Sequence, residues 1–190
     1  MYFIKEEFTQ TYEEKKSKFI AYLTSYENFN SLMKKLKDEH SKGRHFVYAY
    51  RYLNEFDQVV ENCSDDGEPK GTSGRPSLNV LAGNELINSA VIIVRYFGGI
   101  KLGTGGLVRA YSDAVNLVIN NSTLFEYQKL ATIFIELDYS LLSKTEYILN
   151  KLEVKVINKN FENKITLTLS LTTEQLENLK NEIPREVIIK

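Results

Sequence analysis

The sequence predicts an α+β protein of two domains, an N-terminal domain over residues 1–128 and a C-terminal domain over residues 129–190. Two observations predict it. All ten glycines lie between Gly43 and Gly106, so the middle of the chain makes tight turns or lets a ligand approach its backbone. The end of the chain, which has no glycine, instead alternates between strand and helix periods of hydrophobicity.

The N-terminal domain mixes strand and helix patterns. Strands are expected where apolar residues alternate or form short uninterrupted runs, and helices where they recur every three or four positions. The expected elements are a strand at 18–26, a helix at 29–40, a strand at 45–52, a strand at 58–62 that pairs with it, a polar loop at 64–76, a short helix at 77–82, a buried strand at 90–97 and a helix with a broad apolar face at 107–119.

The C-terminal domain has the clearest pattern. Residues 165–171 alternate Ile or Leu with Thr or Ser, which predicts a half-buried strand. Thr172 and Gln175 have the spacing of a capping box, so a short helix carrying Leu176 and Leu179 is expected to follow. With strands at 132–137, 154–159 and 186–189 and a helix at 141–152, the order is β-α-β-β-α-β. This order predicts a ferredoxin-like domain.

The composition excludes several classes of protein. Lys and Arg number 24 against 25 Asp and Glu, a net charge of −1, which excludes a protein that coats nucleic acid by bulk positive charge. Two histidines and one cysteine exclude a zinc finger and a disulfide framework. The chain shows no secretory signal and no apolar run of membrane-spanning length, so we expect a cytoplasmic protein without membrane contact.

Two glycine-containing segments, residues 65–76 and 95–109, stand out, and the stretch from Gly67 to Arg109 has a local excess of positive charge. Between Gly67 and Arg109 there are five cations and two carboxylates. The second segment joins a strand to a helix, and a helix start offers unpaired N–H groups that a phosphate can approach over glycine. A phosphate or carboxylate site is therefore expected among Lys70, Thr72, Ser73, Arg75, Arg95, Tyr96, Gly98, Gly99, Lys101, Gly103, Thr104, Gly105, Gly106 and Arg109.

The known phosphate motifs do not fit this segment. The run from Gly98 to Gly103 continues with Thr104 and Gly105, so it is not a P-loop. Gly103 and Gly105 begin a dinucleotide fingerprint, but Val108 stands where its third glycine belongs. Glycines between a strand and a helix also serve close packing alone, and this alternative stays open.

Other candidate residues have a functional and a structural interpretation. Asp65, Asp66 and Glu68 are suited to a divalent cation or form a solvated turn. His45 is either a general base or a structural residue at the start of a strand, and Cys63 is interpreted as a small, partly buried side chain. Tyr96 is the best candidate for an exposed ring on which an RNA base stacks. No catalytic residue, metal or cofactor is expected.

Four segments resemble the IMPACT family in its bacterial YigZ branch: residues 45–51, 65–76, 95–111 and 15–20. The resemblance covers essentially the whole chain. It implies that the N-terminal domain has the β-α fold shared by the second domain of a small-subunit ribosomal protein and domain four of elongation factor G. It also implies a C-terminal domain similar to the last, ferredoxin-like domain of that factor. Eukaryotic members regulate translation through protein contacts, and RNA or ribosome binding is the usual inference for bacterial members.

Three functions remain open at this point. The first is a non-catalytic binder of RNA or the ribosome, in which five cations contact about five phosphates and give a log–log salt slope of roughly −3.5 to −4.5. Arg95, Lys101 and Arg109 would then be replaceable by Ala together without loss of folding, if they are exposed. The second is a nucleotide- or phosphate-binding enzyme related in fold to small-molecule kinases. The third is a protein-interaction module in translational control.

Overall fold

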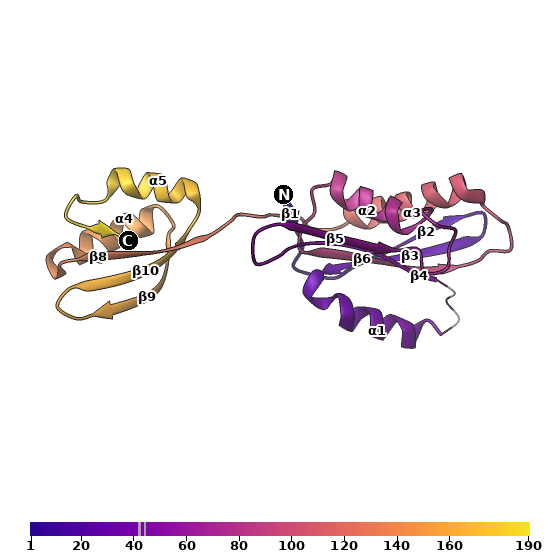
Figure 1. Ribbon diagram of the computed structural model, residues 1–190, viewed down its shortest axis with the longest axis horizontal. Helices are drawn as coiled ribbons and strands as arrows, with labels where there is room; N and C mark the ends of the chain where they lie inside the picture. Colours follow the sequence, from indigo (N-terminus) through magenta and orange to yellow (C-terminus); the bar gives the residue numbers. More distant parts are fainter. Residues whose placement is uncertain (42, 44) are drawn as a thin grey trace. The chain divides into compact units, whose positions relative to one another are not determined.

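The structure is a computed structural model that describes residues 1–41, 43 and 45–190 (Figure 1). It divides into two compact units, residues 1–127 and 128–190. The N-terminal unit contains a five-stranded antiparallel sheet with the strand order β2-β3-β6-β4-β5. These strands are β2 (Phe8–Glu14), β3 (Ser17–Ser25), β4 (His45–Leu53), β5 (Val59–Ser64) and β6 (Ser89–Tyr96).

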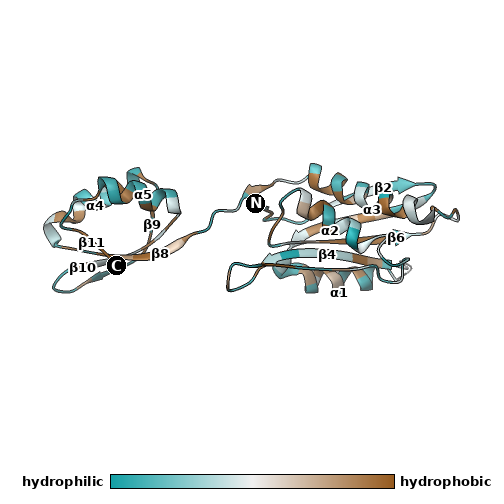
Figure 2. Cartoon of the chain, turned by 45° about the horizontal axis from the view of Figure 1, so that its top comes forward, coloured by the Kyte–Doolittle hydropathy of each residue, from teal (hydrophilic) through white to brown (hydrophobic). Residues whose placement is uncertain are grey.

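Helices cover both faces of this sheet. In Figure 1, α2 (Gly74–Gly83) and α3 (Gly103–Asn120) lie on one face and α1 (Phe29–Glu39) lies on the other. Both hydrophobic and hydrophilic positions occur along these helices in Figure 2, as in helices with one face on a sheet. The short strands β1 (Tyr2–Phe3) and β7 (Phe125–Glu126) pair with each other outside the main sheet.

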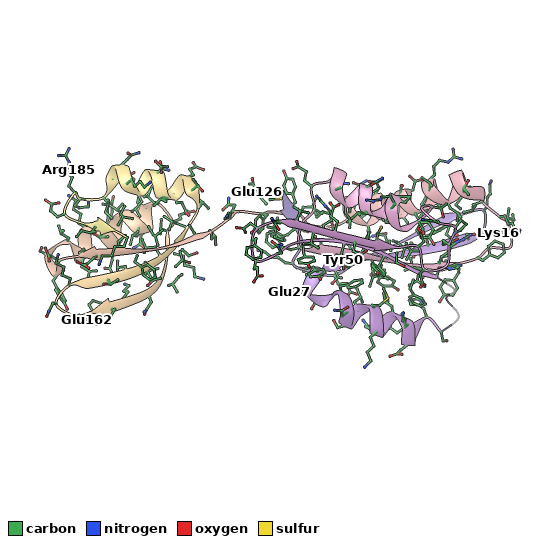
Figure 3. All side chains as sticks on the ribbon, in the orientation of Figure 1. Lys16, Glu27, Tyr50, Glu126, Glu162 and Arg185 are labelled. Atoms are coloured by element: carbon green, nitrogen blue, oxygen red, sulfur yellow. The ribbon has the colours of Figure 1, made fainter. Side chains whose placement is uncertain are left out.

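The central strand β6 has core on both sides. Every residue from Ser89 to Arg95 is buried. Val91 and Ile93 pack in the core beneath α2 and α3, whereas Ile92 and Val94 pack in the core beneath α1. Tyr50 of β4 also contacts the α1 side, where its ring lies 5.3 Å from that of Phe29 (Figure 3). Because side chains alternate along a strand, Arg95 and Tyr96 point to opposite faces of the sheet.

The C-terminal unit confirms the predicted β-α-β-β-α-β order. Its elements are β8 (Ala131–Leu137), α4 (Leu142–Lys151), β9 (Lys155–Phe161), β10 (Ile165–Leu171), α5 (Thr173–Glu182) and β11 (Ile188–Ile189). The antiparallel sheet has the order β11-β8-β10-β9. The capping box is also confirmed, because Thr172 and Gln175 exchange side-chain and backbone hydrogen bonds at the start of α5.

Several elements differ from the sequence prediction, and among them the short strands β1 and β7 were not predicted. Strand β2 was not predicted, because its partly buried positions alternate aromatic residues with the polar Gln10 and Glu14 and so show no continuous apolar face. Polar residues on the inner face are common in strands at the edge of a sheet. Helix α2 begins at Gly74, inside the predicted loop, and Pro76 is tolerated there because the first helical turn needs no N–H from it. Helix α3 begins at Gly103 rather than at residue 107, so three glycines lie in its first turn.

We expect Gly98→Ala to lower the free energy of unfolding by about 1–3 kcal/mol. A Cβ at Gly98 would lie 2.0 Å from the carbonyl carbon of Lys16, in the turn between β2 and β3, and backbone cannot yield as a flexible side chain does. Denaturant unfolding measures the effect. Gly83→Ala is the matched control, since a Cβ there meets nothing within 4 Å. Equal stability of the two variants would contradict the prediction.

Candidate anion-binding cavity

A cavity of about 450 Å³ lies where β6 ends and α3 begins. Its walls come from β4, the loop after β5, β6, the loop that follows β6, and α3. The lining residues are His45, Glu68, Pro69, Arg95, Phe97, Lys101, Leu102, Gly103, Thr104 and Leu107. The cavity therefore brings together four of the expected site residues, Arg95, Lys101, Gly103 and Thr104, and adds His45 and Glu68 to them.

The first turn of α3 opens onto this cavity. Leu102 stands at the N-cap position, and its side chain makes no capping hydrogen bond. A Cβ placed at Gly103 or Gly105 would meet nothing within 4 Å, so the space around this turn is open. The unpaired N–H groups and the partial positive charge at the start of an 18-residue helix favour an anion here.

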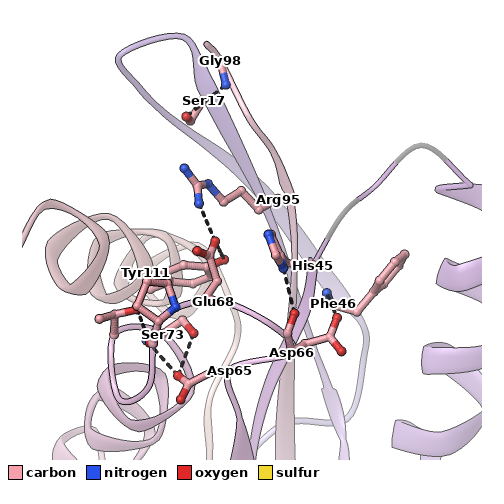
Figure 4. Close-up of polar contacts among 12 residues, drawn as sticks. Ser17, His45, Phe46, Asp65, Asp66, Glu68, Ser73, Arg95, Gly98 and Tyr111 are labelled. Atoms are coloured by element: carbon pink, nitrogen blue, oxygen red, sulfur yellow. Dashed lines mark hydrogen bonds and ion pairs between the residues drawn. The ribbon is translucent and has the colours of Figure 1, made fainter. Parts of the chain in front are cut away.

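Arg95 forms a buried wall of the cavity and is only 6% exposed. Its Nη1 donates to Oε1 of Glu68 at 2.5 Å (Figure 4). Its guanidinium lies over the rings of Phe19 and Phe97. The buried Nε has no hydrogen-bond partner among the described residues. A buried donor without an acceptor is costly, and because Nε has almost no exposed surface, a ligand would reach it only after the surrounding side chains move.

Glu68 connects Arg95 to α3. Its carboxylate is 8% exposed and also accepts a hydrogen bond of 2.9 Å from the hydroxyl of Tyr111. Burial and the charge of Glu68 raise the pKa of Tyr111 far above its usual value, so Tyr111 remains a donor. Glu68 balances the charge of Arg95, which leaves Lys101 as the exposed cation of the cavity. The condition that Arg95 is exposed, on which its replacement together with Lys101 and Arg109 depended, is therefore not met.

His45 lines the same cavity with a fixed orientation. Its Nδ1 lies 2.7 Å from the backbone oxygen of Asp66 (Figure 4). A carbonyl oxygen only accepts, so Nδ1 must carry a proton, and in the neutral ring Nε2 is then the acceptor. His45 also pairs with Arg95 across β4 and β6. The sequence left its role open because this pairing depends on the strand order, which single-sequence patterns do not provide.

The other expected loop forms no open site, because Asp65 fills it. The carboxylate of Asp65 accepts hydrogen bonds from the backbone of Gly71, Ser73 and Gly74 at 2.7, 3.1 and 2.8 Å, and from the hydroxyl of Ser73 at 2.8 Å. Partial burial raises the pKa of Asp65, but these hydrogen bonds outweigh it and hold the pKa below its usual value. The protein's own carboxylate thus occupies the start of α2.

Several expected residues lie away from the cavity. Thr72 and Ser73 are buried in the turn around Asp65, with the Thr72 hydroxyl donating to the backbone oxygen of Pro69, while Lys70 and Arg75 are exposed outside that turn. Gly98 packs on Lys16, and Gly99 is exposed in the loop after β6. Gly106 and Arg109 line a second cavity of about 360 Å³ with Lys15 and Asp113.

Tyr96 is not the exposed ring that the sequence suggested. It is half-buried on the α1 face of the sheet, and its hydroxyl lies 2.8 Å from Nδ1 of His40. The exposed ring of the cavity belongs to the next residue, Phe97, which is 48% exposed. Side chains alternate along the end of β6, so Tyr96 points away from the side that Arg95 faces. Phe97 therefore provides the exposed ring that was expected from Tyr96.

The three neighbouring carboxylates do not converge on a cation. Asp65 binds the start of α2, Asp66 accepts from the backbone N–H of Phe46 at 2.6 Å, and Glu68 pairs with Arg95. Across residues 1–41, 43 and 45–190, no three side chains of the metal-ligating types cluster in a way that suits a metal ion.

Over the same residues, no helix has both the length and the apolar character to cross a membrane.

Comparisons with known proteins match most of the chain, in both units. The Impact N-terminal domain matches residues 15–119, and the domain of unknown function DUF1949 matches residues 135–184. An IMPACT family member of Haemophilus influenzae is 35% identical over 90% of this chain and 84% of its own length. IMPACT family member YigZ of Escherichia coli is 34% identical over 84% of this chain and 79% of its own.

A solved structure agrees with these sequence matches. The crystal structure of a hypothetical protein superposes with a TM-score of 0.66 at 31% identity, and the alignment covers 95% of this chain and 89% of that one. The family models, the bacterial relatives and this fold point to one family, and the chain belongs to the IMPACT family.

Proposed function

We propose that this protein is a non-catalytic, translation-linked regulator that binds RNA, free or within the ribosome, through the cavity at the start of α3. The observation that carries the proposal is the uncapped start of α3, which opens onto the cavity beside the exposed Lys101. The translation link rests on the family, whose eukaryotic members regulate translation. Close packing explains Gly98, and at Gly103 the backbone φ of +71° itself favours glycine, whereas neither reason applies to Gly105.

Each part of a nucleotide has a counterpart in the cavity. A phosphate fits the N–H groups at Gly103 and Thr104, with Lys101 adding positive charge. The exposed ring of Phe97 offers a surface on which an unpaired base stacks. A volume of about 450 Å³ lies within the range of small-ligand pockets and suits one nucleotide rather than a duplex.

The predicted salt dependence is weaker than the sequence suggested. Arg95 is paired internally, and Lys70, Arg75 and Arg109 lie outside the cavity. One or two phosphates at this site give a log–log slope of about −0.7 to −1.4 for single-stranded RNA, instead of the slope expected from five contacts. Fluorescence anisotropy with a labelled single strand over a salt series measures this slope.

We expect Lys101→Ala to weaken single-stranded RNA binding about three- to tenfold and to make the salt slope shallower by about 0.7, because one phosphate contact is lost. Lys34→Ala is the matched control, since Lys34 is an exposed lysine on α1, on the other face of the sheet. The control should bind as the unchanged protein does. Absence of RNA binding at low salt, or equal binding by both variants, would contradict the proposal.

A nucleotide-binding enzyme is the second candidate, and the presence of His45 and Glu68 in the cavity favours it. Millimolar ATP with magnesium should then raise the melting temperature, because a ligand that binds only the folded state stabilises it.

Ribosome pelleting distinguishes RNA binding from the third candidate, a protein-interaction module. Association that survives ribonuclease treatment favours a protein-interaction module, and association that is lost favours RNA binding.

A further inference from the structure

We propose that the cavity selects ribonucleotides over deoxyribonucleotides, with Nε2 of His45 accepting a hydrogen bond from the ribose 2′-hydroxyl. This inference rests on the proposed RNA binding and specifies its ligand class. It starts from an imbalance of donors and acceptors among the groups that line the cavity. Arg95, Lys101, the Thr104 hydroxyl and the first N–H groups of α3 are all able to donate.

A phosphate satisfies those donors, because its oxygens only accept. It leaves the acceptors of the cavity without a partner, however, and these are Nε2 of His45 and the carboxylate of Glu68. Both hydrogen bonds to Glu68, from Arg95 and Tyr111, reach its Oε1. Oε1 of Glu68 therefore has two donors, and the acceptors that remain are its Oε2 and Nε2 of His45, of which Nε2 belongs to the ring that the hydrogen bond to Asp66 orients.

The loop after β5 holds the orientation of His45. Its Nδ1 donates to the backbone oxygen of Asp66 at 2.7 Å (Figure 4). Nε2, on the other side of the ring, therefore points away from Asp66. The ring also packs against Gly67, where an added Cβ would lie 3.4 Å from Nδ1. A ring fixed in this way presents its acceptor without the entropy cost of ordering a free side chain.

The position of a bound nucleotide determines which of its hydrogen-bond donors lies next to His45. With the phosphate at the start of α3 and the base on the exposed ring of Phe97, the sugar lies between them. The 2′-hydroxyl is the sugar's own donor next to the phosphate in an RNA chain, and deoxyribose lacks it. A site with a fixed acceptor therefore discriminates against DNA, because the acceptor is left unpaired when DNA binds.

The experiment compares three single strands of five uridines that differ only at the 2′ position: ribose, 2′-deoxyribose and 2′-fluororibose. Fluorescence anisotropy with the full-length protein should show ribose binding about 5- to 10-fold more tightly than deoxyribose. The 2′-fluoro strand should bind as weakly as the deoxy strand, because fluorine keeps an RNA-like sugar pucker but donates no proton. Tight binding of the 2′-fluoro strand would overturn the inference, since sugar shape would then explain the preference.

His45→Phe should reduce the ratio of ribose to deoxyribose affinity to about onefold, because the acceptor that distinguishes the two sugars is removed. His40→Gln is the matched control, because His40 is the other histidine and lies between Tyr22 and Tyr96 on the opposite face. It should keep the preference. If His45→Phe does not fold, the three strands on the unchanged protein still decide the question. Equal binding of ribose and deoxyribose removes this inference alone, whereas no binding of any strand removes the proposed function as well.

Discussion

Replacing Arg95 with Met is expected to lower the free energy of unfolding by about 3–5 kcal/mol, since it leaves the carboxylate of Glu68 buried without its cation. Arg95 and Glu68 are 6% and 8% exposed, so water cannot replace the lost partner readily. Tyr111 still donates one hydrogen bond to Glu68, but a neutral hydroxyl does not balance a full charge. Denaturant unfolding followed by circular dichroism measures the loss.

The second half of this experiment removes both charges. The double variant Arg95→Met with Glu68→Met should recover much of the loss, because two apolar side chains no longer leave an unpaired charge in the interior. Lys151→Met is the exposed comparison, since its ion pair with Glu182 lies at the surface of the C-terminal unit. That change should cost at most about 1 kcal/mol. A similar cost for Arg95→Met and Lys151→Met would show that the buried pair contributes little.

This result also determines how RNA binding must be tested. The sequence suggested that Arg95, Lys101 and Arg109 be replaced together, on the condition that all three are exposed. Arg95 fails that condition, so the triple variant would lose binding through loss of structure. Lys101 alone is exposed and lines the cavity, which makes it the residue whose replacement reports on the ligand.

The C-terminal unit was the part of the fold that sequence predicted best. In β10 the alternation from Ile165 to Leu171 separates a buried face from a partly exposed face. Such a strand can be predicted from the two-residue period of its hydrophobicity. Strand β6 is buried on both faces, so its sequence gives no alternation. The pattern therefore located the strand but did not indicate which helix layer Arg95 faces.

The site was only partly predictable for a related reason. The start of α3 was found from its glycines, because the conformational freedom of glycine is a local property of the sequence. The partners of the site come from distant segments: Glu68 reaches Arg95, and His45 pairs with Arg95 across two strands. An acidic residue in a loop is ordinarily solvated, and its burial follows only from the packing of that loop against α3.

Replacing Asp65 with Asn is expected to lower the free energy of unfolding by about 2–4 kcal/mol, through the loss of a helix cap and of charge-assisted hydrogen bonds to partly buried N–H groups. The carboxylate accepts four hydrogen bonds from Gly71, Ser73 and Gly74. Asn offers a single acceptor oxygen and turns an NH₂ group toward the remaining donors. Asp38→Asn on the exposed surface of α1 is the matched control and should change stability by less than about 0.5 kcal/mol.

The pH dependence tests the same contact independently. The native pKa of Asp65 lies below its usual value, and the unfolded value is about 3.9, so the unfolded chain binds the proton more readily. The contribution of Asp65 to stability is therefore fully present well above pH 4 and is lost as the pH falls through the depressed native pKa. Asp65→Asn should lose less stability between pH 5 and pH 2, given as approximate limits, than the unchanged protein does. Parallel acid unfolding of both proteins would mean that the carboxylate holds the start of α2 no better than an amide does.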